Sequence, residues 1–174
     1  MKIAGAGIQP VSSFHKIRLF VVIRVSVLHE AEGTTMIKEL TNETEWLEGY
    51  PVMHELRTHL DQDAYLACLR TMREEGYTLL ALYEQDEIAA LAGIGILTNF
   101  YFGRHVFIYD LVTKSSMRSK GYGNELLAHV HRYAKESGCG IVALGSGLAN
   151  LDAHRFYETK MGYEKTAYSF ICRV

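Results

Sequence analysis

The hexapeptide RSKGYG at residues 118–123 has the residue types and spacing needed to hold an anion. It lies between an apolar, strand-like run at 106–113 and a helix-like run at 124–136. A helix start exposes backbone N–H groups and partial positive charge, which together favour an anion. The two glycines let the backbone approach a phosphate, and Arg118 and Lys120 add positive charge. The segment therefore predicts a pyrophosphate cradle for a nucleotide-like cofactor.

The spacing of this segment is R-x-x-G-x-G, which is neither a P-loop nor a dinucleotide fingerprint. It resembles the acetyl-CoA signature of the GNAT superfamily of N-acetyltransferases. A second motif, N-x-x-A-x-x-F-Y from Asn150 to Tyr157, is followed by Gly162 and Tyr163 and also resembles that family. The resemblance covers roughly residues 36–174. One departure is a spacer of four residues between Tyr157 and Gly162, where many members have three.

The resemblance implies the fold, the co-substrate and the site. The expected fold is α/β, with a mixed, mostly antiparallel central sheet flanked by helices on both faces. Acetyl-CoA is the implied co-substrate, and Tyr157 is the implied general acid, since an unperturbed phenol stays protonated at neutral pH. Backbone groups of the strand before the cradle would pair with the pantetheine arm, and one amide would polarise the acetyl carbonyl. The implied cofactor-binding residues are Leu111, Val112, Thr113, Arg118, Ser119, Lys120, Gly121, Tyr122, Gly123 and Asn150. For Asn150, a helix-capping role is an equal alternative.

An alkylamine acceptor must lose a proton, which costs about 4–5 kcal/mol at pH 7. Asp110 is a candidate catalytic residue, as general base, and His105 is a second candidate, although a surface role is the simpler interpretation for it. A structural Asp110, bonded to a backbone amide or to Arg104, is equally compatible with the sequence. Strand alternation predicts one shared face for four residues, which are Val106, Ile108, Asp110 and Val112.

Two further pairs of side chains could carry chemistry. Glu45 and Glu48 are three residues apart on a predicted helix and could line the acceptor site, although a solvated face is the simpler interpretation. His129 and His131 are two apart and do not share a helix face, so no metal site is expected.

Size and composition favour an ordinary globular protein of one domain. The chain has 174 residues, 48% of them hydrophobic and 22% charged, with a net charge of −2. This balance argues against a nucleic-acid partner, which usually requires a basic face. The apolar run at 19–27 is too short for a membrane span. Three widely spaced cysteines, with no C-x-x-C pattern, are expected to be reduced thiols, and the default location is cytoplasmic.

Hydrophobic periodicity predicts the elements that position these residues. Residues 1–35 are expected to be an N-terminal extension, either upstream of a natural start at Met36 or carrying an extra strand at 18–27. The N-acetyltransferase domain is expected over 36–174. Pro51 predicts a kink or break in its first helix, and Gly76 predicts a helix end. The elements expected in chain order are a strand at 36–40, helices at 43–60 and 63–75, strands at 77–83, 88–97 and 106–113, a helix at 124–136, a strand at 140–145, a helix ending near Tyr157 and a last strand at 166–174.

Transfer of acetyl from acetyl-CoA to a primary amine of a small molecule is the leading functional hypothesis. The alternatives are acetylation of a protein lysine or N-terminus and a CoA-binding sensor without activity. A toxin that acetylates aminoacyl-tRNA would need a basic face, so the net charge of −2 counts against it. The family resemblance also suggests a homodimer.

Overall fold

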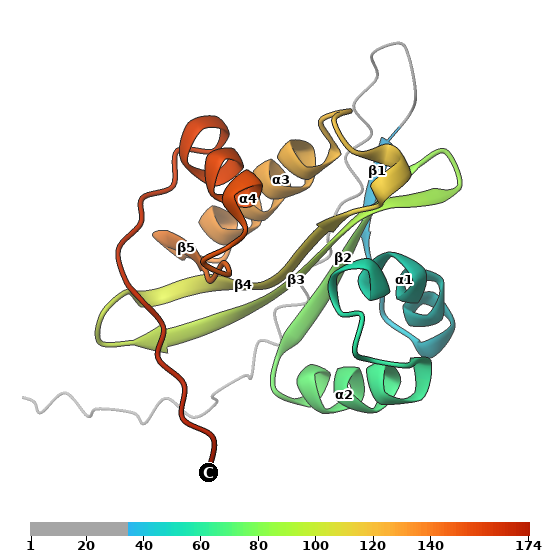
Figure 1. The fold of residues 1–174 in the computed structure, drawn as a ribbon, viewed down its shortest axis with the longest axis horizontal. Helices are drawn as coiled ribbons and strands as arrows, with labels where there is room; N and C mark the ends of the chain where they lie inside the picture. The colour runs from blue at the N-terminus through green and yellow to red at the C-terminus, as the bar shows by residue number, and fades with distance from the viewer. Residues whose placement is uncertain (1–34) are drawn as a thin grey trace, which may run out of the picture.

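The computed structural model describes residues 35–174. The strand hypothesised at 18–27 and the extension that contains it lie outside the described residues. The elements are β1 (Thr35–Glu39), α1 (Glu43–Leu56), α2 (Gln62–Glu74), β2 (Tyr77–Glu84), β3 (Glu87–Asn99), β4 (Gly103–Thr113), η1 (Ser115–Met117), α3 (Tyr122–Glu136), β5 (Ile141–Leu144), α4 (Leu151–Arg155) and the π-helix η2 (Phe156–Lys160) (Figure 1).

A single five-stranded sheet forms the centre of the molecule, in the order β1-β2-β3-β4-β5. Strands β1 to β4 pair with one another in antiparallel order, and β5 pairs with β4 in parallel. Helices α1 and α2 lie on one side of this sheet, and α3 lies on the other (Figure 1). The expected mixed sheet with helices on both faces is therefore confirmed. No helix among residues 35–174 is long and apolar enough to cross a membrane.

Local sequence signals explain where α1 and α2 begin and end. The side chain of Asn42 accepts a hydrogen bond from the Glu45 amide, and Glu45 accepts in return from the Thr41 amide, at 3.1 and 2.6 Å. The predicted break at Pro51 is wrong, because α1 continues through it to Leu56. Helix α1 is therefore shorter than the predicted 43–60. Gly76 follows α2 with a φ of +94°, in agreement with its predicted role.

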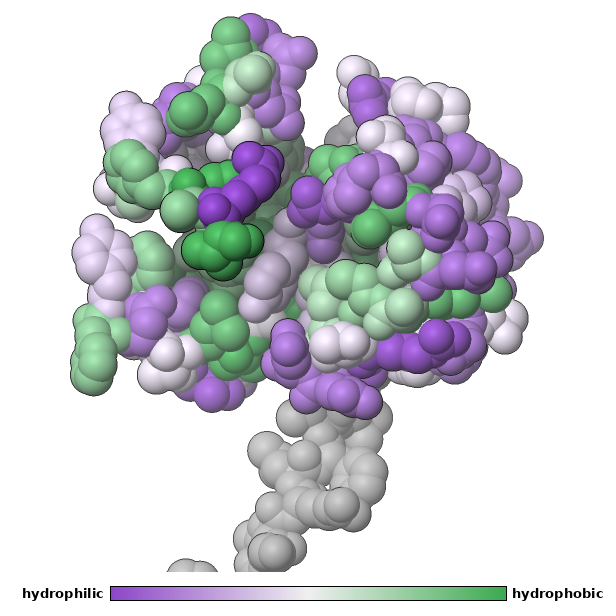
Figure 2. All heavy atoms as spheres, turned by 60° about the horizontal axis from the view of Figure 1, so that its bottom comes forward, coloured by the Kyte–Doolittle hydropathy of each residue, from purple (hydrophilic) through white to green (hydrophobic). Residues whose placement is uncertain are grey.

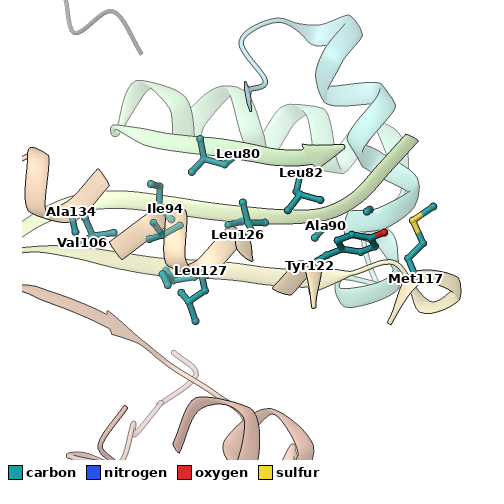
Figure 3. Close-up of a cluster of buried hydrophobic side chains, with 14 of the residues drawn as sticks. Leu80, Leu82, Ala90, Ile94, Val106, Met117, Tyr122, Leu126, Leu127 and Ala134 are labelled. Carbon is teal, nitrogen blue, oxygen red and sulfur yellow. The ribbon is translucent and has the colours of Figure 1, made fainter. Parts of the chain in front are cut away.

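Each face of the sheet carries its own hydrophobic core. On the α3 side, Leu126, Leu127 and Val130 are fully buried against strands β2 to β4 (Figure 3). On the α1–α2 side, a second cluster packs around Leu40 and Leu91. Burying large side chains on both faces stabilises the sheet from which the site is built.

A β-bulge interrupts β4 at Tyr109. Asp110 is opposite Gly93 and Ile108 is opposite Ile94, so no residue of β3 is opposite Tyr109. The extra residue moves every later side chain of β4 to the opposite face of the sheet from the one that strict alternation predicts. The predicted common face is therefore wrong: Val106 and Ile108 belong to the α3-side cluster, whereas Val112 belongs to the α1–α2 side, and Asp110 bonds Tyr77 there.

The end of the chain differs from the prediction in two respects. The predicted strand at 166–174 is absent: the segment is exposed, and Phe170 is 92% exposed. A strand needs a hydrogen-bonding neighbour, and this segment pairs with no other strand among residues 35–174. Upstream, the four-residue spacer between Tyr157 and Gly162 lies largely in the π-helix η2. A π-helix closes its hydrogen bonds over one more residue than an α-helix does, so it can accommodate one extra residue.

Candidate functional site

The sheet opens between its last two strands. The parallel pairing of β4 with β5 ends at Ile108 and Leu144, although β4 continues to Thr113. Within residues 35–174, no strand therefore lies beside residues 109–113 on the β5 side. This open edge of β4 contains Leu111, Val112 and Thr113, the residues expected to pair with the pantetheine arm.

The hydrogen-bond pattern indicates which backbone groups of that edge are free. Beyond the end of β4, the Lys114 amide donates to the Ala89 carbonyl at 2.9 Å. Antiparallel strands alternate between residues that bond the neighbour and residues that face away. By this alternation, Leu111 and Thr113 direct their N–H and C=O groups away from β3. The open edge can therefore bond an extended, amide-containing ligand.

The predicted cradle at 118–123 follows the open edge after the short helix η1. Ser119 and Gly121 have left-handed φ angles of 65° and 91°, and Gly121 is the N-cap of α3 without any side-chain cap bond. Helix α3 begins at Tyr122, two residues earlier than predicted. Because no side chain of the described residues forms a cap bond there, the first amides of α3 are available to an anion.

Two basic side chains flank the cradle at the surface. Arg118 donates from Nε to the Thr113 carbonyl at 3.3 Å, and its Nη2 lies 3.6 Å from a Glu55 carboxylate oxygen. Lys120 Nζ lies 3.4 Å from a carboxylate oxygen of Glu84. Exposed pairs of this kind contribute little to stability, so both cations can turn toward a bound phosphate.

Three elements of the site meet at Gly123. A methyl group built on Gly123 would lie 3.3 Å from Thr113 Oγ1 and 3.9 Å from Phe156 Cζ. The end of β4, the start of α3 and the start of η2 are thus packed around one glycine. Tyr157, which follows Phe156, is half-buried in the same region.

Tyr157 belongs to a cluster of aromatic side chains. Its ring centroid is 5.8 Å from that of Tyr163, whose hydroxyl is 2.8 Å from Nε2 of His131. Burial raises the pKa values of both tyrosines and lowers the pKa of His131. Tyr157 therefore keeps its proton at neutral pH, as a general acid must.

Asn150 occupies the N-cap of α4. Its side chain accepts a hydrogen bond from the Ala153 amide at 3.3 Å, which is the capping role considered as the alternative to cofactor contact. The side-chain amide nitrogen has no protein partner among the described residues. A contact between that nitrogen and a ligand remains compatible with capping.

Asp110 is buried beside the bulge and both its oxygens have partners. Arg57 Nε donates to Oδ1 at 2.8 Å, and the Tyr77 hydroxyl donates to Oδ2 at 2.9 Å. The expected structural partner, Arg104, instead bonds the Ser137 carbonyl. Arg57 and Tyr77 could not be predicted as its partners, because no local pattern in the sequence links the end of α1 to β2 and β4.

Three other candidates have structural roles. His105, expected at the surface, is 1% exposed and bonds the Gly103 carbonyl at 3.0 Å. Glu45 caps α1, and Glu48 accepts from the Tyr83 hydroxyl. These contacts account for the two glutamates, so nothing supports placing them at an acceptor site.

A hollow of about 460 Å³ lies between the β2–β3 turn and the cradle residue Lys120, with Met117 also in its lining. Its lining includes Glu84, Asp86 and Glu87, which would repel a phosphate. The open edge of β4 and the start of α3 are therefore the better place for an anionic ligand. Among residues 35–174, no group of three His, Cys, Asp or Glu side chains could hold a metal ion.

An open strand edge that leads into an uncapped, glycine-rich helix start suits a ligand with an amide-containing arm and a pyrophosphate, which is the chemistry of coenzyme A. Comparison with known proteins agrees. The model of the acetyltransferase (GNAT) family matches residues 37–163, and the chain belongs to this family. It is a GNAT N-acetyltransferase, and acetyl-CoA is the acetyl donor that this family uses.

Individual relatives support the same family. The chain is 47% identical over 135 residues to the uncharacterized N-acetyltransferase YhdJ of Bacillus subtilis, covering 77% of this chain and 95% of that protein. It is 33% identical over 63 residues to an aminoalkylphosphonate N-acetyltransferase of Salmonella typhimurium, covering 36% and 40% of the two chains. In fold, it resembles the aminoglycoside N-acetyltransferase AAC(6')-Iy in complex with CoA, with a TM-score of 0.73 and 19% identity over 84% of this chain and 99% of that one.

Proposed function

We propose that this enzyme transfers the acetyl group of acetyl-CoA to a primary amine of a small molecule, by direct attack while both substrates are bound. The observation that carries the proposal is the open edge of β4, which is followed, after the short helix η1, by the start of α3, where the N-cap Gly121 makes no side-chain cap bond. Two relatives named for acetylating aminoalkylphosphonates and aminoglycosides support a small amine as acceptor.

The proposed site divides the binding of acetyl-CoA between backbone and side chains. The outward-facing backbone groups of Leu111 and the N–H of Thr113 would pair with its amide-containing arm, since the Thr113 carbonyl already accepts from Arg118 Nε. The first amides of α3, with Arg118 and Lys120, would hold its pyrophosphate. When bound, acetyl-CoA supplies an acetyl group activated as a thioester. Asn150 is proposed as a further contact to the arm.

Two residues are proposed to move protons. Tyr157 holds a proton on its phenolic oxygen, and burial keeps it there at neutral pH, so it can protonate the departing sulfur. Asp110 is proposed as the acceptor of the amine proton, because it is the buried carboxylate next to the bulge.

The proposed function is tested by following thiol release from acetyl-CoA with a panel of amines. The panel contains aminoalkylphosphonates, aminoglycosides, a lysine-containing peptide and a peptide with a free N-terminus. Release with a small amine, and none with either peptide, is the expected result. Release with a peptide alone would favour protein acetylation. Tight acetyl-CoA binding without release for any amine would favour the sensor.

We further propose a homodimer in the cytoplasm. Hydrophobic residues gather on the left and centre of the face in Figure 2, the side on which β5 and the end of the chain lie in Figure 1. The exposed side chains Tyr168, Phe170 and Ile171 are at this end. Such surface favours association with a second copy. Sedimentation velocity of the full chain should show a dimer, and a monomer at all concentrations would contradict it.

A further inference from the structure

Arg57 lies at the point where the sheet opens. The last pair of β4 with β5 joins Ile108 to Leu144, and the next residue of β4 is the bulged Tyr109. Arg57 donates from Nη2 to the Tyr109 carbonyl at 3.0 Å. The guanidinium therefore bonds the carbonyl of the bulged residue, which has no partner residue in β3. This carbonyl lies at the start of the open edge.

The same guanidinium holds the buried carboxylate of Asp110. Arg57 Nε donates to Oδ1 at 2.8 Å, and Nη2 lies 2.7 Å from the same oxygen. The Tyr77 hydroxyl fixes the other oxygen, and it can reach there only because Gly93 has no side chain: a methyl group on Gly93 would lie 1.8 Å from that hydroxyl. Asp110 is thus fixed from two directions.

Only arginine suits this position. Its planar fork offers several N–H donors in a fixed arrangement, so it can bond a carbonyl and a carboxylate together, whereas a lysine ammonium is a point charge on a flexible stem. Arg57 is also the first residue after α1, and its own amide donates to the Met53 carbonyl at 2.9 Å. It therefore ties the end of α1 to the bulge.

We propose that Arg57 is a positioning residue for acetyl transfer. It holds the bulged Tyr109 peptide and the Asp110 carboxylate in the arrangement that the reaction needs, without itself exchanging a proton. This inference rests on the proposed function, since it assumes that the reaction takes place where β4 and β5 separate.

The test compares Arg57→Lys and Arg57→Met with Arg70→Met. Arg70 is a matched control, because its Nε also donates to a carboxylate, that of Glu43, at 2.7 Å, but at the surface. Steady-state kinetics with an amine accepted by the wild type should show kcat reduced by roughly 10²-fold in both Arg57 variants, since small misplacements of reacting groups cost about that much. KM for acetyl-CoA should stay near the wild-type value, and the control should behave as wild type.

A merely structural role makes a different prediction. It would lower the melting temperature of the Arg57 variants and leave kcat unchanged at temperatures where they are folded. A folded Arg57→Lys variant with wild-type kcat would overturn the proposal.

If the Arg57 variants do not fold, Tyr77→Phe is the substitute test, because it keeps the ring over Gly93 and frees one oxygen of Asp110. This variant should lower kcat and preserve KM for acetyl-CoA. An unchanged kcat would count against the proposal. A wild-type protein that acetylates no amine would instead refute the proposed function.

Discussion

Tyr157 is the proposed general acid, and its role can be tested by removing a single oxygen atom. Replacing Tyr157 with Phe removes only the hydroxyl, so acetyl-CoA binding should be retained while kcat falls by about 10²-fold or more. Steady-state kinetics and equilibrium binding separate the two effects. Tyr168→Phe, in the exposed C-terminal segment, is the control and should leave kcat unchanged. Wild-type kcat in Tyr157→Phe would show that another group protonates the leaving sulfur.

The raised pKa of Tyr157 also has a consequence for the pH dependence of catalysis. Burial makes the phenolate less favourable, so the proton is retained beyond the usual value of about 10. Loss of this proton should therefore not reduce kcat of the wild type between pH 7 and about 9.5. A kcat profile that falls on the alkaline side in the wild type, but not in Tyr157→Phe, would contradict the burial of this phenol.

Gly123 offers a second test at the level of one residue. Gly123 has no left-handed φ angle and lies in the first turn of α3, where alanine is compatible with the backbone, so Gly123→Ala should fold. Its methyl group would nevertheless lie 3.3 Å from Thr113 Oγ1, beside the open edge. We expect at least about tenfold weaker acetyl-CoA binding by calorimetry, or about 1.4 kcal/mol.

The matched control for that variant is Gly140→Ala. A methyl group on Gly140 would meet no atom within 4 Å, and Gly140 follows the C-terminal end of α3, whereas Gly123 lies at its start. Its acetyl-CoA affinity should equal that of the wild type. If Gly123→Ala also binds with wild-type affinity, the packing around Gly123 is not part of the cofactor site.

At the scale of elements, most of the fold could be predicted from the sequence. Caps, apolar periodicity and glycine positions located the helices and the first five strands to within a few residues, because these signals are local. The bulge at Tyr109 could not be predicted, since it depends on how β3 and β4 align. The ion pair of Arg57 with Asp110 could not be predicted for the same reason, because 53 residues separate its partners.

The C-terminal segment shows the limit of propensity. Residues 166–174 alternate in the manner of a strand, but strand formation depends on a partner, and no strand of the described chain pairs with them. The cradle shows the opposite case. Its glycines and basic residues are adjacent in sequence, so motif and structure coincide. Whether its residues bind acetyl-CoA is still a prediction.

At the scale of the whole molecule, histidine burial should make stability depend on pH. Burial lowers the pKa of His131 in the folded state, so the unfolded chain binds a proton more readily below about pH 6.5. The free energy of unfolding should therefore decrease as the pH falls from 7.5 to 5. In His131→Gln this decrease should be smaller, although His129 contributes in the same direction. Urea titrations at pH 7.5 and pH 5 measure this change in the free energy of unfolding.

His59→Gln provides the comparison for that experiment, because His59 is exposed and has no hydrogen bond among the described residues. The free energy of unfolding of His59→Gln should decrease as much as that of the wild type when the pH falls from 7.5 to 5. An identical pH dependence in His131→Gln and the wild type would mean that protonation of His131 is not linked to unfolding.

The central claim is that one site uses the open edge of β4 for the arm of acetyl-CoA and the start of α3 for its pyrophosphate. Calorimetric titration of the wild-type protein with acetyl-CoA and with S-acetylpantetheine, which lacks the pyrophosphate, tests it most directly. We predict a dissociation constant in the micromolar range for acetyl-CoA, about −8 kcal/mol, and binding at least about 100-fold weaker for the truncated ligand. Equal affinity for the two would contradict the cradle, and no binding of acetyl-CoA would contradict the site as a whole.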